Sequence, residues 1–281
     1  MADAHRRAAV AERAARAGGA VARDVFRGEL AVETKADKID LVTEADRDAQ
    51  RQVIATVREE FPTDEIVGEE DATPSVGPGE NAEIHKTVPA GADTWVIDPI
   101  DGTSNYVRGS RVWTTSVAAV ADGGVVAAAT YLPTVEDMYT AGADGGSRNG
   151  EPLSVSERTD PETFVVSPTG AYPRDGGDRL GRAAEAVVRD LGDLRRFGSM
   201  QSTLAFVASG ELDAAFTPTR EHVWDTLAGV HLIREAGGMV TDLAGDPWTP
   251  DSEGLVASNG EAHEAVREVA VVSAERTGPE S

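Results

Sequence analysis

The sequence predicts a mixed α/β protein, because two textures of secondary structure follow one another along the chain. Residues 112–141 consist of short β-rich runs with turn signals between them, a pattern typical of strands joined by tight turns. After about residue 155, segments with strand and helix patterns alternate, which indicates an α/β arrangement. A chain of 281 residues can form one large domain or two small ones, and either can bury a sizeable core.

The N-terminal part predicts two helices and a loop. Apolar residues recur at three- and four-residue steps over residues 10–25, and this first helix is expected to stop near Gly28. Thr43-Glu44-Ala45-Asp46 resembles a capping box with Asp in the usual place of Glu or Gln, ahead of a second apolar stripe over residues 53–61. Residues 71–93 form a long polar loop, rich in Gly and Pro.

The remaining elements follow from turn signals and periodicity. Residues 144–146 and 149–150 have the composition of hairpin turns, as do residues 122–124 and 132–134 within the β-rich part. The alternating strands and helices are expected at residues 164–167, 180–191, 199–209, 214–217, 226–236 and 239–243.

The composition excludes several classes of protein. The chain has no cysteine, so disulfides, thiolate metal sites and a cysteine phosphatase are excluded. It has no apolar run of about 18 residues, and its N-terminus is charged and helical rather than signal-like. We therefore expect a cytoplasmic protein that does not associate with membranes.

The net charge of −23 is extreme. Nearly all basic residues are arginine, since the only lysines are Lys35, Lys38 and Lys86. Acidic residues are spread along the whole chain, which favours adaptation to high salt, where screening over about 3 Å at 1 M removes self-repulsion. An ordinary acidic cytosolic protein is the alternative. Nucleic-acid binding is not expected without a basic surface, and an anionic substrate must be attracted by bound metal.

The strongest functional pattern is Trp95-Val96-Ile97-Asp98-Pro99-Ile100-Asp101-Gly102-Thr103-Ser104-Asn105. Its apolar run predicts a buried strand that ends at Asp98, and a proline turn places Asp101 three residues on. Two carboxylates at a strand end can bind a hard cation such as Mg²⁺. Free N–H groups just beyond them can hold a phosphate at a helix N-terminus. Taken alone, an Asp-Pro turn with a helix cap explains the same residues.

Three further segments accompany this pattern: Asp40-Leu41-Val42-Thr43-Glu44-Ala45-Asp46, Ile66-Val67-Gly68-Glu69-Glu70 and Val223-Trp224-Asp225-Thr226. The motifs occur in a fixed order: an acidic pair after glycine, then D-P-I-D-G-T, then W-D before a helix that ends in Gly-Gly. In this order they resemble the signature of the inositol monophosphatase family of Mg²⁺-dependent, lithium-sensitive phosphatases. The resemblance extends from about Lys35 to the Ala257-Ser258-Asn259-Gly260 segment.

The resemblance implies a five-layer αβαβα fold with two lobes. An N-terminal α+β lobe, residues 1–150, would carry most of the metal ligands. A C-terminal α/β lobe, residues 151–281, would carry Asp225 and the substrate contacts. The site would lie between the lobes, and the protein would form a symmetric homodimer.

The resemblance also implies a site for two or three Mg²⁺ ions. The first ion would bind Glu69, Asp98 and the backbone carbonyl of Ile100. The second would bind Asp98, Asp101 and Asp225, and a weaker third would bind Glu69 and water. Several carboxylates from distant parts of the chain are what two-metal phosphate hydrolysis requires.

Catalytic and substrate-binding residues follow from the same resemblance. Glu70 would orient the attacking water, and Asp46 would pair with the Thr103 hydroxyl in a general-base relay. Each acid also has a structural interpretation: Asp46 as a helix cap, Glu70 as a solvated surface acid, and Asp225 as an N-cap. The phosphate would rest on the N–H groups of Gly102 and Thr103. The expected substrate contacts are Asp101, Gly102, Thr103, Gly198, Ser199 and Asp225.

The match weakens at substrate recognition. Met200 stands where relatives carry a small residue, and Pro218 stands where inositol-specific relatives tend to carry a glutamate. Arg220 can instead pair with a second phosphate, and Arg195 and Arg196 are other candidates. Lys35 lies in the loop that approaches the third metal in relatives, although a surface position explains it equally well.

These observations favour a Mg²⁺-dependent phosphomonoesterase acting on inositol monophosphate or a related small phosphate of a polyol, sugar or nucleotide. Within this class the alternatives are fructose-1,6-bisphosphate and 3′-phosphoadenosine 5′-phosphate. A nucleotide would require an aromatic or wide apolar shelf for the base, and none is evident in the sequence. An alternative of another class is a non-catalytic interaction protein of the same fold, against which the complete acidic set argues.

The net charge predicts that stability depends on salt. Lowering the ionic strength from 0.15 M to 0.01 M lengthens the screening distance from about 8 Å to about 30 Å, so acid–acid repulsion then acts across the molecule. We expect the melting temperature, measured in chelator, to rise steadily from about 0.05 M to about 2 M KCl. An unchanged melting temperature over that range would mean that the acidity is not an adaptation to salt.

Overall fold

The computed structural model describes residues 2–28, 32–34, 41–71, 83–170, 172 and 178–274, with the backbone alone for residues 32–34, 41 and 42. Its α-helices are α1 (Ala2–Val25), α2 (Glu44–Arg58), α3 (Thr103–Val107), α4 (Arg179–Asp190), α5 (Met200–Ala208), α6 (Val223–Glu235) and α7 (His263–Ala274). A single 3-10 turn, η1 (Pro161–Thr163), adds to these within the described ranges.

Two sheets contain nearly all of the strands. The larger has eight strands in the order β10-β9-β8-β7-β6-β5-β3-β4, with β3 parallel to β4 and β5 and the other neighbours antiparallel. Its strands are β3 (Glu65–Gly68), β4 (Ile84–His85), β5 (Thr94–Asp101), β6 (Thr114–Ala121), β7 (Gly124–Leu132), β8 (Asp137–Gly142), β9 (Gly145–Arg148) and β10 (Glu151–Pro152).

The smaller sheet has five strands in the order β12-β11-β13-β15-β14. They are β11 (Val165–Pro168), β12 (Asp193–Leu194), β13 (Ala214–Thr217), β14 (Met239–Thr241) and β15 (Leu255–Ser258). A separate two-stranded ribbon pairs β1 (Val32–Thr34) with β2 (Leu41–Thr43).

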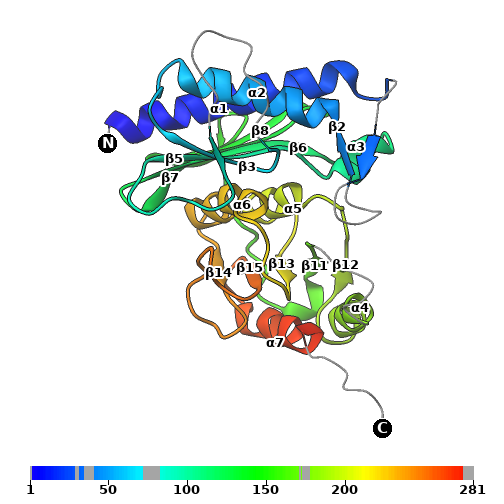
Figure 1. Ribbon diagram of the computed structural model, residues 1–281. Coiled ribbons are helices and arrows are strands. Elements are labelled where there is room, and N and C mark those ends of the chain that lie inside the picture. Colours follow the sequence, from blue (N-terminus) through cyan, green and yellow to red (C-terminus); the bar gives the residue numbers. More distant parts are fainter. Residues whose placement is uncertain are drawn as a thin grey trace.

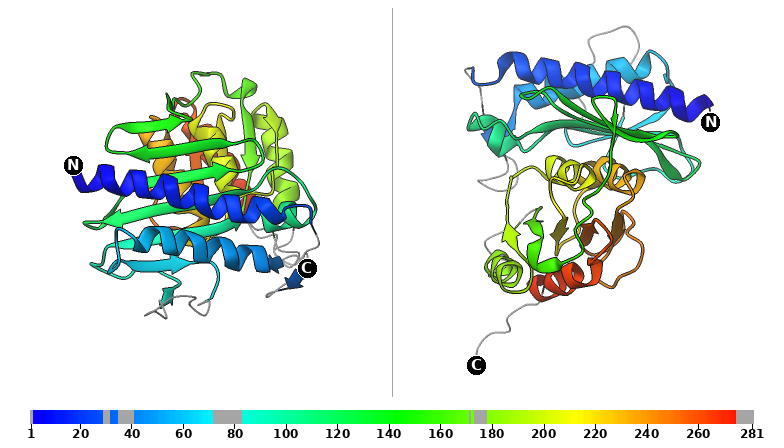
Figure 2. Two further views of the ribbon diagram at one scale, coloured as in Figure 1. Left: turned by 90° about the horizontal axis from the view of Figure 1, so that it is seen from above. Right: turned by 180° about the vertical axis from the view of Figure 1, so that it is seen from behind.

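Helices and sheets stack in five layers (Figure 1). In order they are α1 with α2, the eight-stranded sheet, α5 with α6, the five-stranded sheet, and α4 with α7. Seen from above, α1 and α2 lie side by side across the outer face of the larger sheet (Figure 2). The αβαβα fold expected from the sequence is confirmed, while the division at residue 150 stays a prediction.

Burial on both faces explains the composition of the middle layer. All residues of α5 except Phe206 are buried, and α6 is buried except at Asp225, His231, Arg234 and Glu235. A helix packed between two sheets needs an apolar surface all round, so it lacks a single stripe. The outer helix α1 does have such a stripe, and it includes Gly18, where an added Cβ would lie 2.5 Å from the Val53 side chain.

Most predicted elements are confirmed, with shifted ends. Helix α1 ends at Val25 rather than near Gly28, and α6 begins at Val223 instead of at residue 226. The strand expected to stop at Asp98 continues to Asp101. Part of the predicted loop 71–93 is the short strand β4, which pairs with β3. The capping box at Thr43 is present, with Asp46 as the partner.

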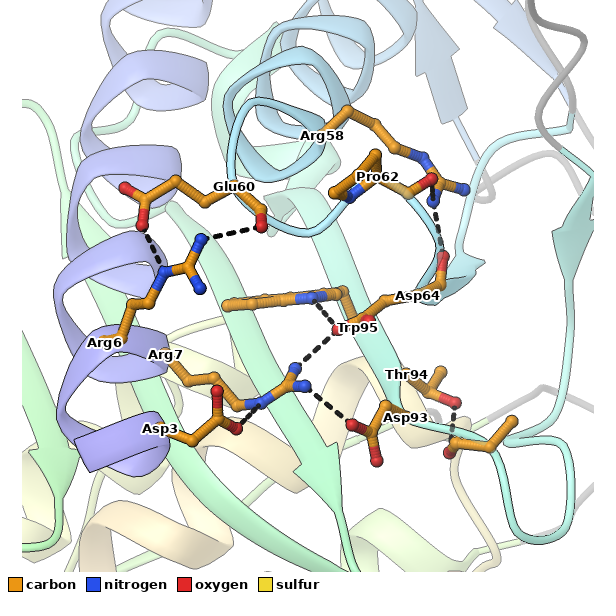
Figure 3. Close-up of polar contacts among 11 residues, drawn as sticks. Asp3, Arg6, Arg7, Arg58, Glu60, Pro62, Asp64, Asp93, Thr94 and Trp95 are labelled. Carbon is orange, nitrogen blue, oxygen red and sulfur yellow. Dashed lines mark hydrogen bonds and ion pairs between the residues drawn. The ribbon is translucent and has the colours of Figure 1, made fainter. Parts of the chain in front are cut away.

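A buried ion-pair cluster fixes the start of α1 on the sheet (Figure 3). The Arg7 side chain is 3% exposed and pairs with Asp64 at 2.5 Å, with Asp93 at 2.7 Å and with Asp3 at 2.7 Å. Asp64 Oδ2 also accepts a hydrogen bond of 2.9 Å from Trp95 Nε1. Three segments distant in sequence therefore meet at one guanidinium.

We expect Arg7→Leu to lower the free energy of unfolding by about 3–5 kcal/mol, because it leaves the Asp64 carboxylate buried without its cation. Arg23→Ala is the matched control, since Arg23 lies on the same helix in an exposed pair with Glu136. Such exposed pairs contribute about 0–1 kcal/mol. Urea denaturation of both variants measures this, and equal losses would contradict a special role for the buried cluster.

Candidate active site

The end of β5 is irregular, and this irregularity brings two aspartates to one place. The register against β6 shifts between Asp98 and Asp101, and the Thr115 hydroxyl donates a hydrogen bond of 2.7 Å to the Pro99 carbonyl within that stretch. In a regular strand, residues three apart point to opposite faces. The shift lets the Asp98 and Asp101 side chains converge, so the proline turn predicted here occurs inside the strand.

A third carboxylate reaches the same point from another layer. Asp225 lies in the first turn of α6, whose N-cap is His222, so the interpretation of Asp225 as a plain N-cap is wrong. One oxygen from each of Asp98, Asp101 and Asp225 lies within 4.8 Å of the others. This group combines the end of β5 with the start of α6 and matches the ligand set expected for the second ion.

The electrostatics of this cluster call for a cation. Burial raises the pKa of Asp98 well above its usual range, and the nearby charges of Glu69, Asp101 and Asp225 raise it further. Burial, Asp101 and Glu69 likewise raise the pKa of Asp225. Neither carboxylate oxygen of Asp98 has a hydrogen-bond partner among the residues that the structure describes. Buried, unpartnered oxygens on crowded acids fit a hard divalent cation.

The N-terminus of α5 holds Asp101. Its carboxylate accepts hydrogen bonds from the Ser199 hydroxyl, from Met200 N at 3.1 Å and from Gln201 N at 2.7 Å. Burial raises the pKa of Asp101, and these donors oppose that rise. Ser199, expected as a substrate contact, therefore helps to orient the Asp101 carboxylate. Gly198, which precedes it, has a left-handed backbone with φ of 74°.

The acidic pair after β3 is held by two residues that the sequence did not single out. The Gln50 amide bonds both the N–H and the carbonyl of Glu70, each at 3.0 Å. Lys86 Nζ donates to the Glu69 carbonyl at 2.8 Å. Glu70 is 4% exposed, so its interpretation as a solvated surface acid is wrong. Gly68 leaves room for this amide, since an added Cβ would lie 2.6 Å from Gln50 Oε1 and would displace the Gln50 side chain.

Asp46 contacts both of the partners that the sequence suggested for it. One oxygen, Oδ2, accepts from Thr43 N at 2.8 Å and from the Thr43 hydroxyl at 2.6 Å, which caps α2. The other, Oδ1, faces the Thr103 hydroxyl at 3.4 Å. That hydroxyl also donates to the Ile100 carbonyl at 3.1 Å. Gly102, before Thr103, has φ of 90° and opens α3.

The candidate arginines differ in the groups that they bond. Arg220 pairs with Asp251 and Arg195 with Asp193, each at 2.6 Å. Arg196 instead donates to the carbonyls of Pro168 and Gly170, at 3.2 and 3.3 Å.

Two further residues concern substrate recognition. Lys35 lies outside the described residues. Near Pro218, Glu221 accepts from the Thr217 and Thr219 hydroxyls, at 2.7 and 2.8 Å. Its charge contributes to the raised pKa of Asp225, so a carboxylate does stand close to the cluster despite the proline.

The model of the inositol monophosphatase family matches residues 3–274. The chain belongs to this family. Its members are metal-dependent phosphoric monoester hydrolases, and this is the class of enzyme that the acidic cluster indicates.

Named relatives and solved structures agree with this assignment. The chain is 35% identical over 239 residues to the fructose-1,6-bisphosphatase/inositol-1-monophosphatase of Thermotoga maritima, with 85% of each chain covered. It is 37% identical over 249 residues to the probable inositol 1-monophosphatase ImpA of Mycobacterium tuberculosis, with 86% of each covered. It is 33% identical over 263 residues to the Nus factor SuhB of Pseudomonas aeruginosa, covering 92% and 93%.

The fold is shared with solved members of the family. The structure of the Thermotoga maritima IMPase superposes with a TM-score of 0.81 at 32% identity, covering 93% of this chain and 95% of that one. The inositol monophosphatase of Anabaena superposes with a TM-score of 0.77 at 25% identity, covering 95% and 96%. Among the described helices, none is long and apolar enough to cross a membrane.

The raised pKa of Asp98 predicts that replacing this residue makes the metal-free protein more stable and the enzyme less active. An acid whose pKa is higher in the folded state destabilises the fold as the pH rises from its unfolded value through its folded value. In metal-free protein at about pH 8, Asp98→Asn should therefore raise the melting temperature by a few degrees, about 2–4 °C per kcal/mol. It should also weaken Mg²⁺ binding by more than about 100-fold and leave less than a tenth of the activity.

Calorimetric melting in chelator at about pH 5 and about pH 8, with both proteins, measures the stability effect. The stability difference between wild type and Asp98→Asn should shrink at the lower pH, because the raised pKa of Asp98 favours its protonated form as the pH falls. An Asp98→Asn protein that is less stable than wild type at both pH values would contradict the electrostatic interpretation. One that keeps more than a tenth of wild-type turnover at saturating Mg²⁺ would contradict the ligand assignment.

Proposed function

We propose that the protein is a Mg²⁺-dependent phosphomonoesterase that hydrolyses inositol monophosphate or a related small sugar phosphate to an alcohol and inorganic phosphate. The observation that carries the proposal is the group of Asp98, Asp101 and Asp225, whose ligand oxygens lie within 4.8 Å of one another. The oxygens of Asp98 lack other partners in the described part of the chain. Family membership supports the same chemistry.

The proposed ligand roles follow the expected set. Asp98, Asp101 and Asp225 would hold one ion, and Glu69, Asp98 and the Ile100 carbonyl another. When bound, Mg²⁺ would supply an acidified water and charge stabilisation at the leaving oxygen. Asp98 and Asp101 are already buried, and the first turn of α5 orients the Asp101 carboxylate, so little reorganisation of these two ligands is needed before substrate binds.

Proton transfer and substrate binding would fall to neighbouring groups. The Thr103 hydroxyl would take a proton from the attacking water and pass its own to Asp46, which faces it at 3.4 Å. Glu70, fixed through its backbone by Gln50, would orient that water. The N–H groups of Gly102 and Thr103 would hold the phosphate, where the backbone of Gly102 turns into α3.

Three phosphate esters are candidate substrates. The name of the Thermotoga maritima relative includes fructose-1,6-bisphosphatase, which supports a bisphosphate alternative. Among the candidate arginines, Arg196 is the one that donates to backbone carbonyls instead of pairing with a carboxylate, so it is our candidate for binding a second phosphate. The third candidate is 3′-phosphoadenosine 5′-phosphate.

A non-catalytic role is the alternative of another class. The Nus factor SuhB relatives carry names that refer to other activity, but an acidic site this costly to maintain favours catalysis. The symmetric dimer and the cytoplasmic location expected from the sequence stay predictions.

The proposal predicts release of inorganic phosphate from one or more of inositol 1-phosphate, fructose 1,6-bisphosphate and 3′-phosphoadenosine 5′-phosphate. We expect the monophosphate to be hydrolysed in Mg²⁺ and not in chelator, with Asp98→Asn as the negative control. If Arg196 binds a second phosphate, Arg196→Ala should raise the KM for the bisphosphate by about 10-fold or more and leave the monophosphate KM unchanged. No phosphate release from any of the three would contradict the proposal.

A further inference from the structure

A single glutamine connects the two parts of the acidic cluster. Gln201 is the second residue of α5 and is completely buried. Its backbone N–H donates to Asp101 Oδ2 at 2.7 Å. Its side chain makes two more bonds in the opposite direction: Nε2 donates to the Trp224 carbonyl at 2.6 Å, and Oε1 accepts from Gly229 N at 2.9 Å.

The two backbone groups that Gln201 contacts lie on either side of Asp225. Trp224 immediately precedes it in α6, and Gly229 follows about one helical turn later. A rigid planar amide bonded at both ends fixes the position of that turn relative to α5. Because the backbone of Gln201 is bonded to Asp101 as well, one residue relates two carboxylates that come from different layers.

The packing around Gly229 shows that this contact needs a specific sequence. An added Cβ at residue 229 would lie 2.4 Å from Leu204 Cβ and 3.0 Å from Gln201 Oε1. Only glycine lets the backbone of α6 approach α5 closely enough for the amide to reach it. Leu204 packs in the same interface with no polar atom, so apolar contact alone can join the two helices.

Satisfying buried polar groups does not explain the amide. The Trp224 carbonyl and the Gly229 N–H both lie within α6, where standard helical bonding offers each a partner four residues away. Burying an amide has a desolvation cost that an apolar side chain of the same length avoids. The amide therefore has a role in geometry rather than in satisfying its neighbours.

We propose that Gln201 is a positioning residue that sets the separation of the Asp101 and Asp225 carboxylates and thereby the affinity for Mg²⁺. This inference rests on the metal site of the proposed function. Loss of the amide leaves all three carboxylates in place and lets α6 shift relative to α5. The cost should appear in metal affinity, as it does for other residues that orient metal ligands.

The test is Gln201→Met, which keeps the length of the side chain and removes both amide bonds. Isothermal titration with Mg²⁺ should give a dissociation constant raised by about 10–100-fold. The kcat at subsaturating Mg²⁺ should fall, while the KM for the phosphate ester stays within about twofold of wild type at saturating Mg²⁺. If Gln201→Met does not fold, Gln201→Ala removes the same two bonds with a small helix-forming residue.

Leu204→Ala is the matched control, because it loosens the same helix interface without touching the hydrogen bonds. It should lower the melting temperature and leave the Mg²⁺ dissociation constant within about twofold of wild type.

Equal Mg²⁺ affinity in wild type and both Gln201 variants would overturn the inference and leave the phosphatase proposal intact. An equal loss of affinity in Leu204→Ala would also overturn it, since general loosening would then explain the effect. A wild-type protein that binds no Mg²⁺ would overturn the proposed function and, with it, this inference.

Discussion

Mutual repulsion among buried carboxylates is the constraint on which the rest of the site depends. Asp98, Asp101 and Asp225 approach within 4.8 Å, and Asp98 and Asp101 are almost completely buried. Without a cation, such a group favours either protonation or separation of the acids. The fold must therefore hold the acids together against their own charge, and polar contacts from α2, α5 and the segment around Lys86 contribute to this.

Several backbone donors supply that restraint. The first turn of α5 directs N–H groups at Asp101, and the positive end of a helix dipole favours a negative charge at that position. The Gln50 amide and Lys86 hold the Glu69–Glu70 segment through its backbone. The supporting groups act on main chain or on one carboxylate at a time, so the oxygens of Asp98 stay available to a ligand.

The sequence predicted the acids better than their support. D-P-I-D-G-T and the W-D pair locate Asp98, Asp101 and Asp225 because their spacing and neighbours are specific. Gln50 and Gln201 carry no such signal, since a glutamine in an apolar-periodic helix resembles an ordinary polar position. Their partners are residues 20 to 28 positions away, and only the packing of the layers brings those together.

The fold was predictable to a similar degree. Alternation after residue 155 and the turn signals before it locate most elements because they reflect local chain preferences. The continuation of β5 to Asp101 and the strand β4 depend on pairing with distant strands, which no local pattern contains. The start of α6 at Val223 was missed because a helix buried on both sides lacks the polar–apolar boundary by which its first turn is recognised.

In the proposed mechanism, the two contacts of Asp46 would link the start of α2 to proton transfer. One oxygen closes the start of α2 and the other faces Thr103, so the carboxylate cannot rotate to serve either partner without releasing the other. A proton arriving on Oδ1 would reduce the negative charge that Oδ2 presents to the helix terminus. Each turnover would then briefly weaken the cap of α2. Because the cap is stronger when Asp46 is ionised, the stability of α2 would favour release of the proton and return Asp46 to its ionised form.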